Sequence, residues 1–464
     1  MDSERKKHKS ENVEDRIVDD EIPIIAFNFN RLYYDSFLNL VLRGQIRGKD
    51  LIYFCNTSKR FREYGDKKLH LTNSQGNQVG PPKTEHIFRL LLAKMYITIP
   101  FGKTPKQTYI ERTIGGQVWG FGNNRTGELT SDPTLPKKML PTLIPNMNRI
   151  VQASCGYSHS MCLDNQGRVW GCGNNDQSQL GLGNNYIDAS PNLNPYLEDI
   201  VQISCGEEYT LCLNNQGQVC SFGRNTIGQL SFSNDYLIDT PILLYSMTNI
   251  IQISCKSQHA LCLNKDGQVW AFGSNRYSEL GLQDHNMAKP TIIPNLNNII
   301  QVSCGAGYSL CLDDQGRIWT FGNNESGQLG LGDNKRRETP TLISDLPKIV
   351  QISAGTYHSL CLDNQGRVWS FGYNKFGQLG LGDNNNRNIP TLISTLENII
   401  QVSVGDDYSL CLDDKGKVWS FGKNSCKRLG LNGNDKNIPI LNPSLNNVVQ
   451  ISAGYGHALC ISGP

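Results

Sequence analysis

Histidines recur at one position of a repeating sequence, and they are the first candidates for catalysis or metal binding. The position is occupied, in chain order, by His159, Tyr209, His259, Tyr308, His358, Tyr408 and His457. A catalytic histidine would be needed once, whereas a histidine that exchanges with tyrosine over seven copies is typical of a repeated structural hydrogen bond. The pattern therefore predicts a structural role for this position and gives no catalytic residue.

Glycine-rich loops and cysteines are the other candidates for chemistry. The Asp-Asn-Gln-Gly loop at 363–366 and the Gly-Leu-Gly-Asp-Asn loop at 380–384 lack the spacing of a calcium-binding EF-hand or a P-loop, and turn formation explains both. The chain has 15 cysteines but no Cys-x-x-Cys pair. Most of them recur at two repeat positions, so we predict small buried hydrophobic residues in a reducing compartment. We expect no enzyme activity, no metal and no cofactor.

The candidates belong to a phrase that repeats about every 50 residues. The clearest copy of this motif is Gly366-Arg367-Val368-Trp369-Ser370-Phe371-Gly372. All six tryptophans of the chain occupy the same position of the motif. Such a strict period indicates one supersecondary unit used seven times. Each unit contains short apolar runs rich in Val, Ile, Trp and Phe that are separated by turn residues, which is typical of strands.

The units predict an all-β fold, a seven-bladed β-propeller of four-stranded antiparallel blades. The repeats enter at Gly116, just before the third strand of a blade, and end near Cys460, in the second strand of a blade. The N-terminal and C-terminal strand pairs should therefore complete one blade together, which closes the ring and removes its open edges.

Charge divides the chain into three predicted segments. Residues 1–21 form a charged tail with a net charge of −3, which we expect to be disordered. Residues 22–110 form a small basic helical module with a net charge of +9, and 111–464 form the propeller with a net charge of −4. No apolar run is long enough for a membrane span, and the N-terminus lacks the features of a signal peptide, so we expect an intracellular protein in the cytoplasm or nucleus.

The repeat resembles that of the regulator of chromosome condensation family over residues 113–464. The resemblance is carried by Gly-x-x-His-Ser-Leu, by Gly-x-Val-Trp-x-Phe-Gly-x-Asn and by Gly-Gln-Leu-Gly-Leu-Gly-Asp. It implies a seven-bladed propeller in which the Val-Gln-Ile-Ser strands line the centre and Trp and Phe fill the space between blades. The founding member of that family exchanges nucleotide on the GTPase Ran, an activity linked to a wedge-like insertion that the uniform blade lengths here do not contain.

Within the basic module, residues 50–62 resemble the second half of an F-box. The Leu-Pro that usually opens that motif is missing, and Tyr34-Asp35 stands near its place. The resemblance implies binding to the Skp-type adaptor of a cullin ubiquitin ligase. The adaptor-binding candidates are Leu51, Phe54, Lys59, Arg60 and Phe61. An ordinary amphipathic helix with a basic face is the alternative.

Residues that vary among the copies of the repeat are candidates for recognising a binding partner. Two of them follow the glycine at the end of each first strand, where the turns of a propeller surround the axis. They include the partner-binding candidates Tyr157, Glu207, Glu208, Tyr357, Asp406, Asp407 and Tyr455. Together they predict an acidic, aromatic patch for a basic protein partner, with simple solvated turns as the alternative. The basic run 335–337 is interpreted as solvated charge.

Three copies depart from the repeat. Cys220 replaces the tryptophan, Lys256 replaces the glycine after the first strand, and residues 425–429 replace Ser-Gly-Gln-Leu. These changes represent either drift or one specialised side of the ring.

The sequence thus favours a non-enzymatic protein-interaction scaffold, in sharper form a substrate-recruiting subunit of a cullin ubiquitin ligase. A guanine-nucleotide exchange factor for a small GTPase and a nucleic-acid-associated or virion-associated structural protein are the alternatives. The abundance of Asn, Ile and Lys suggests an AT-rich genome, such as that of a large DNA virus or a protist.

Overall fold

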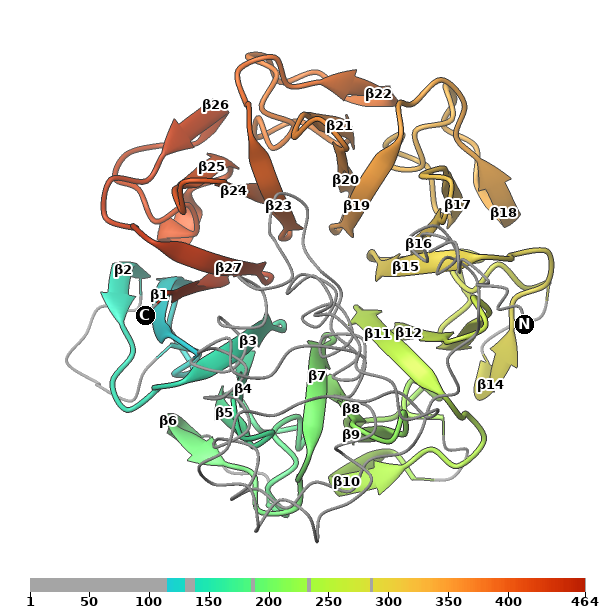
Figure 1. Ribbon diagram of the computed structural model, residues 1–464, viewed down its shortest axis with the longest axis vertical. Coiled ribbons are helices and arrows are strands. Elements are labelled where there is room, and N and C mark those ends of the chain that lie inside the picture. Colours follow the sequence, from blue (N-terminus) through green and yellow to red (C-terminus); the bar gives the residue numbers. More distant parts are fainter. Residues whose placement is uncertain (1–114, 130–137, 185–187, 232–234, 284–286, 464) are drawn as a thin grey trace, which may run out of the picture. The chain divides into compact units, whose positions relative to one another are not determined.

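The computed structural model describes residues 115–129, 138–184, 188–231, 235–283 and 287–463. The predicted tail and helical module, with the candidate adaptor-binding residues, lie outside the described residues. The described part forms seven four-stranded antiparallel sheets, arranged as the blades of a ring (Figure 1). This confirms the predicted all-β propeller. Among the described residues, no helix is long and apolar enough to cross a membrane.

Six blades are formed by four consecutive strands each. Blade 1 consists of β3 (Ile150–Cys155), β4 (His159–Asp164), β5 (Val169–Gly173) and β6 (Asp188–Leu193). Blade 2 consists of β7 (Ile200–Cys205), β8 (Tyr209–Asn214), β9 (Val219–Arg224) and β10 (Leu237–Leu243). Blade 3 consists of β11 (Ile250–Lys256), β12 (His259–Asn264), β13 (Val269–Gly273) and β14 (Met287–Ile292). Blade 4 consists of β15 (Ile299–Cys304), β16 (Tyr308–Asp313), β17 (Ile318–Gly322) and β18 (Arg337–Leu342).

Blade 5 consists of β19 (Ile349–Ala354), β20 (His358–Asp363), β21 (Val368–Gly372) and β22 (Arg387–Leu392). Blade 6 consists of β23 (Ile399–Val404), β24 (Tyr408–Asp413), β25 (Val418–Gly422) and β26 (Lys436–Leu441), with the short 3-10 helix η3 (Ser425–Lys427) before β26. Blade 7 combines β27 (Val448–Ala453) and β28 (His457–Ser462) with β1 (Gln117–Asn123) and β2 (Lys138–Leu143).

Blade 7 closes the ring as the sequence predicts. Strand β1 pairs antiparallel with β28 in a register that places Gln117 opposite Ser462 and Trp119 opposite Cys460. The first strand pair of the propeller and its last strand pair therefore share one sheet. No blade of the described part is left with an incomplete set of strands.

The first strand of each blade lies closest to the ring axis (Figure 1), and its glutamine joins it to the next blade. In blade 1 the Gln152 Oε1 atom accepts a hydrogen bond of 3.0 Å from the backbone N–H of Ile203 in blade 2. The last such bond runs from the Ala153 N–H to Gln450 Oε1 at 2.8 Å, from blade 1 back to blade 7. All seven equivalent glutamines accept in this way: Gln152, Gln202, Gln252, Gln301, Gln351, Gln401 and Gln450.

A second set of bonds runs parallel to the glutamines. In each first strand a serine hydroxyl accepts from the backbone N–H of the following blade, as Ser154 does from Cys205 at 3.0 Å. The seven serines are Ser154, Ser204, Ser254, Ser303, Ser353, Ser403 and Ser452. Backbone groups that face a neighbouring blade would otherwise lack partners, so these side chains satisfy them and fix the spacing of the blades.

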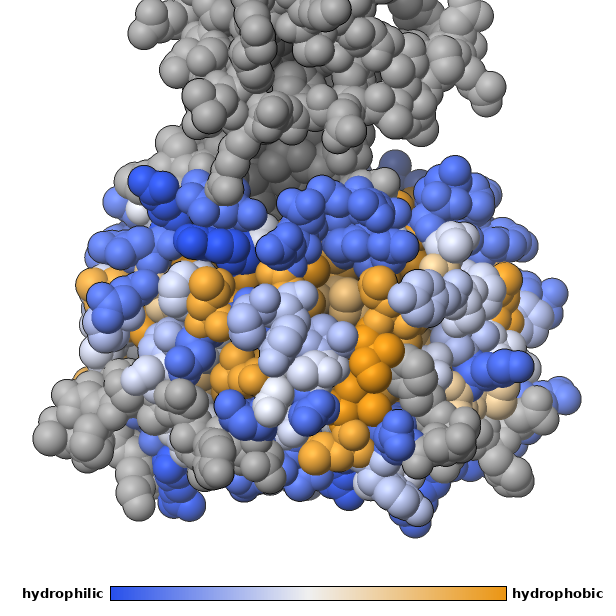
Figure 2. All heavy atoms as spheres, turned by 90° about the horizontal axis from the view of Figure 1, so that it is seen from below, coloured by the Kyte–Doolittle hydropathy of each residue, from blue (hydrophilic) through white to orange (hydrophobic). Residues whose placement is uncertain are grey.

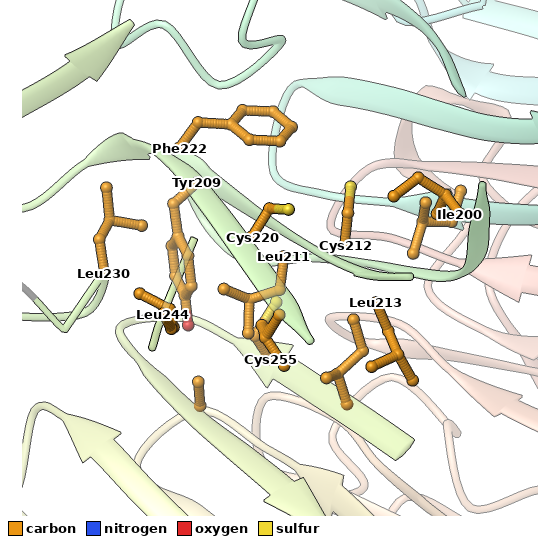
Figure 3. Packing of buried hydrophobic residues seen from close by; sticks show 14 of the residues in the cluster. Ile200, Tyr209, Leu211, Cys212, Leu213, Cys220, Phe222, Leu230, Leu244 and Cys255 are labelled. Carbon is orange, nitrogen blue, oxygen red and sulfur yellow. The ribbon is translucent and has the colours of Figure 1, made fainter. Parts of the chain in front are cut away.

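Phenylalanine and cysteine fill the space between blades, as expected. In the cluster that spans blades 1 to 3, Figure 3 shows Cys212, Cys220 and Phe222 on one face of blade 2 and Tyr209, Leu211 and Leu213 on the other. None of the 14 cysteines that the structure describes forms a disulfide bond, and of these only Cys426 is not buried. Burial raises the pKa values of the Cys155 and Cys205 thiols to about 12, so these thiols stay protonated and behave as apolar groups.

The tryptophans pack against the cores between blades, as the resemblance implies, although they are only half-buried. Trp170 packs against the core between blades 7 and 1, and its Nε1 atom donates a hydrogen bond to Asp164 Oδ2 at 3.3 Å. Opposite the tryptophans, the outer strands expose single apolar residues such as Leu193 and Leu342. Seen edge-on in Figure 2, apolar side chains lie on the side wall of the ring below a hydrophilic edge. Single exposed apolar residues of this kind are ordinary for a protein surface.

Turn formation explains the two glycine-rich loop types, as predicted. Asp164 Oδ1 accepts from the backbone N–H groups of Gln166 and Arg168, which builds the hairpin between β4 and β5. In the long loop of blade 5, Asp383 Oδ1 accepts from the Asn385 N–H at 2.9 Å. Among the described residues no group of three or more His, Cys, Asp or Glu side chains could hold a metal ion.

Candidate protein-binding face

One end of the ring combines two kinds of segment, and we call it the turn face. It consists of the turns between the first and second strands and of the long loops between the third and fourth strands. Backbone hydrogen bonds join the two, such as Asn174 N to Ser158 O at 2.8 Å in blade 1 and Tyr373 N to Tyr357 O at 2.8 Å in blade 5. The hairpins between the second and third strands lie at the opposite ends of the strands.

Below the turn face, the His and Tyr side chains of the repeat form hydrogen bonds between blades, as predicted. His358 Nε2 lies 2.9 Å from the Ser409 hydroxyl of the next blade, and His457 Nε2 lies 2.9 Å from that of Ser160. The tyrosine hydroxyls also bond to the backbone of the next blade, since that of Tyr308 donates to the carbonyl of His358 at 2.7 Å and lies 2.9 Å from the Ser359 hydroxyl. Both residue types therefore connect neighbouring blades from the same position.

The buried histidines predict acid sensitivity. Burial lowers the pKa of His159 and His358 to about 3 and that of His259 and His457 to about 4, against about 6.5 in an unfolded chain. The unfolded state therefore binds about four more protons near pH 5, so the stability present above pH 6.5 decreases as the pH falls towards 4. The expected loss is about 1.4 kcal/mol per pH unit for each histidine.

Urea unfolding between pH 7.5 and 5 measures this proton uptake. His358→Tyr, which introduces the residue that other blades carry, should reduce the uptake by about one proton. An unfolding free energy that stays constant over this pH range would contradict the assignment of neutral buried histidines.

The structure brings the candidate tyrosines together in two groups. Tyr157 and Tyr455 come from neighbouring blades, and their ring centroids lie 4.3 Å apart with an interplanar angle of 35°. Tyr357 contacts Tyr373 edge-on at 6.1 Å, and Tyr373 contacts Phe376 at 6.3 Å. The candidates Tyr157, Tyr357 and Tyr455 are 40%, 43% and 41% exposed, so each presents a partly free ring surface on the turn face.

The candidate carboxylates do not form the free acidic patch that the sequence suggests. Asp406 and Asp407 are buried, and their partners are Arg428, at 3.6 Å, and Lys423, at 2.8 Å.

In blade 2, Glu208 forms an ion pair with Arg224 at 2.5 Å. Glu207 accepts a hydrogen bond from Gln258 Nε2 at 3.3 Å. The expected negative charge is therefore largely balanced, and the aromatic rings are the more distinctive feature of the face.

Two of the three departures from the repeat converge on Asp406. Lys256, in blade 3, and Arg428, in the long loop of blade 6, both act to lower the pKa of the Asp406 carboxyl, although burial and the neighbouring Asp407 raise it overall. Arg428 also donates to the Tyr455 carbonyl at 3.3 Å. Blades 3 and 6 are not neighbours, so these two departures are coupled through Asp406 across the ring and do not mark one specialised side of it.

Sequence reasoning missed the loop residues that complete the groups, namely Tyr373, Phe376 and Lys423. Lys423 pairs with Asp407 and places its ammonium 4.3 Å from the centroid of the Phe376 ring. A signal was present, because position 373 and its equivalents directly follow the glycine of the third strand and vary between Asn, Arg, Ser, Tyr and Lys.

Comparisons with known proteins agree with this architecture. A stretch of 81 residues is 38% identical to Protein RCC2 of Homo sapiens and covers 17% of this chain and 15% of that protein. The chain thus matches only a small part of the length of this curated relative. The structure of Prp20p from Saccharomyces cerevisiae has a TM-score of 0.69 at 21% identity and covers 77% of this chain and 95% of that chain. Human WBSCR16 has a TM-score of 0.68 at 23% identity, with 75% and 99% covered.

The fold likeness and the family match cover the same part of the sequence. The model of the RCC1-like domain matches residues 117–460, which include strands from all seven blades. The chain therefore belongs to the RCC1-like domain family.

Proposed function

We propose that the propeller is a non-enzymatic scaffold that binds a protein partner through its turn face. The observation that carries this proposal is the pair of half-exposed rings of Tyr157 and Tyr455, with the group around Tyr357 on the same face. Tyrosines presented in this way provide large contact area with few rotatable bonds, and they are enriched among the residues that dominate binding energy.

The backbone beneath these rings is suited to binding because it is already ordered. The N–H of Gly454 donates to the carbonyl of His457 at 2.9 Å, and the Tyr455 N–H donates to Gly156 O of blade 1 at 3.2 Å. A rigid surface loses little conformational entropy when a partner binds, so more of the contact energy appears as affinity.

The finer form of the proposal is a substrate-recruiting subunit of a cullin ubiquitin ligase. The turn face would hold the cargo protein, and the F-box-like residues between Leu51 and Phe61 would bind a Skp-type adaptor. The family supports a role in protein binding, since the structural study of Prp20p concerns its binding to Gsp1p and histones.

The test compares the double variant Tyr157→Ala/Tyr455→Ala with the wild-type chain in crosslinked affinity purification and quantitative mass spectrometry. Loss of two aromatic anchors should lower retention of the specific partner by about tenfold or more. The control is Tyr245→Ala, because Tyr245 is 81% exposed and lies in the connection from β10 to β11 at the other end of the strands.

The identity of the retained protein separates the alternatives. A Skp-type adaptor and a cullin support the ligase form, whereas a small GTPase whose nucleotide release the chain accelerates supports an exchange factor. Salt-sensitive retention of nucleic acid supports the structural alternative. Equal retention of every protein by the double variant and the control would overturn the turn face as the binding surface.

A further inference from the structure

Lys256 occupies a place at which six of the seven blades have glycine. The glycines leave room for the aromatic ring that follows, since a Cβ at Gly305 would lie 2.1 Å from Tyr308 Cε1. In blade 3 the backbone differs, because β11 continues to Lys256, which pairs with His259, and Ser257 then adopts a φ of 49°. The local fold of this blade is therefore altered in a way that accommodates a long cationic side chain.

The Lys256 side chain reaches across the ring to two other blades. Its Nζ atom donates to the carbonyl oxygen of Val404 at 2.7 Å, with longer contacts to Gly405 O at 3.5 Å and Ala354 O at 3.4 Å. Val404 and Gly405 belong to blade 6 and Ala354 to blade 5, so the contacts skip blade 4. They span 148, 149 and 98 residues of sequence.

These carbonyls immediately precede the turns that carry candidate binding residues. Gly405 is followed by Asp406 and Asp407, and Ala354 lies three residues before Tyr357. We propose that Lys256 is a positioning residue, which holds the turns of blades 5 and 6 at fixed places on the turn face. We call the contacts of Lys256 Nζ with the carbonyls of Val404, Gly405 and Ala354 the clasp. The purpose of the clasp rests on the proposed function, but the clasp itself can be tested without a partner.

The charge around Lys256 supports a clasp that acts through its ammonium. The titratable groups that interact electrostatically with Lys256 are Asp406, Cys304, Cys155 and His358. Burial keeps the histidine neutral and the thiols protonated, so Asp406 is the acidic partner. Burial lowers the pKa of Lys256 to about 8, which means that its surroundings only partly offset the loss of water around the ammonium.

Burial disfavours the charged form of Lys256, so a contribution to the overall stability of the propeller does not explain why a lysine stands at this position. A glycine, as in the other blades, would avoid that desolvation. Lys256 instead contacts three carbonyls at the start of two turns in blades 5 and 6, so the loss of these contacts should reduce order in those two turns.

Hydrogen–deuterium exchange of the full chain followed by mass spectrometry tests the clasp. Lys256→Met keeps the length of the side chain but removes the ammonium. We expect amides of 355–358 and 405–408 to exchange about tenfold faster at pH 7, as expected for the loss of one charge-assisted hydrogen bond. The amides of 156–159 in blade 1 should be unchanged.

A matched variant and a pH series make the result specific. Arg224→Met removes the cation that pairs with Glu208 on the same face, and it should leave 355–358 and 405–408 unchanged. Between pH 6.5 and 9, after correction for intrinsic rates, the wild-type turns should lose protection while those of Lys256→Met stay constant. Lys256→Arg, which remains charged, should preserve more protection than Lys256→Met at pH 9.

Two outcomes would overturn the clasp. One is an unchanged exchange pattern in Lys256→Met, and the other is faster exchange in every blade, which would indicate a general loss of stability. Both leave the proposed function intact, because the tyrosine double variant tests that function separately. Conversely, a confirmed clasp in a chain whose turn face binds nothing would refute only the proposed function.

Discussion

Deleting residues 447–464 is expected to leave no cooperatively folded propeller. The deletion removes β27 and β28, so β1 loses one of its two partner strands and the β1–β2 pair is left without the other half of its sheet. Buried apolar residues of blades 7 and 1, which pack around Leu459 and Ile461, become exposed. The loss of several large buried side chains, at about 2 to 5 kcal/mol each, exceeds the total stability of an ordinary domain.

The deletion also removes hydrogen bonds that join blade 7 to blade 1. These include the bonds from the Ala153 N–H to Gln450 Oε1 and from the Cys155 N–H to the Ser452 hydroxyl, as well as that between Ser160 and His457. Thermal unfolding followed by circular dichroism, with size-exclusion chromatography, measures the result. The control deletes only 463–464. A single cooperative transition within about 5 °C of the wild type would show that the ring does not need its closing pair.

The second large loss of stability is expected from the substitution Gly405→Ala. A Cβ at this position would lie 2.1 Å from Tyr408 Cε1 and 2.7 Å from the carbonyl oxygen of Gly454. Tyr408 is fully buried and its hydroxyl donates to the His457 carbonyl at 2.7 Å, so the ring cannot move aside without losing that bond. Overpacking at such a site costs about 3 kcal/mol. The unfolding free energy from urea titration provides the measurement.

Gly456→Ala is the matched control for this substitution. Gly456 lies in the turn that follows β27, and the nearest atom to a Cβ there is Asn123 Cβ at 3.2 Å, which belongs to a side chain of the turn face. This variant should change the unfolding free energy by less than about 1 kcal/mol. If Gly405→Ala were equally mild, the close approach of Tyr408 would not be the reason for glycine at this repeat position.

The sequence predicts the blade count and the closure because both are encoded locally. Each unit marks its third strand with a variant of Gly-x-Val-Trp, and in six of the seven units the hairpin before that strand ends in glycine, so seven copies can be counted directly. The half units at the two ends of the repeat region imply a shared blade, and the pairing of Trp119 with Cys460 confirms it. The exchange of histidine with tyrosine likewise predicts the hydrogen bonds beneath the turn face.

The charges of the turn face could not be predicted in the same way. Turn residues are usually solvated, so Asp406 and Asp407 suggest free acidity, whereas the structure pairs them with Arg428 and Lys423 from a long loop. The contacts of Lys256 with two distant blades depend on the geometry of the whole ring. Periodicity identifies which residues are unusual, but it does not give the direction in which an unusual side chain points.

The register of β1 and β28 makes the ring independent of where its polypeptide begins. Since Gln117 and Ser462 are partners in neighbouring strands, the two ends of the propeller lie about 5 Å apart, the spacing of paired strands. A short peptide could join them, and the backbone could be reopened at a surface hairpin such as 165–166. Such a circular permutant would keep all seven sheets with their order unchanged. The order of the blades around the ring therefore specifies the architecture, and the fold does not depend on where in the ring the polypeptide chain is interrupted.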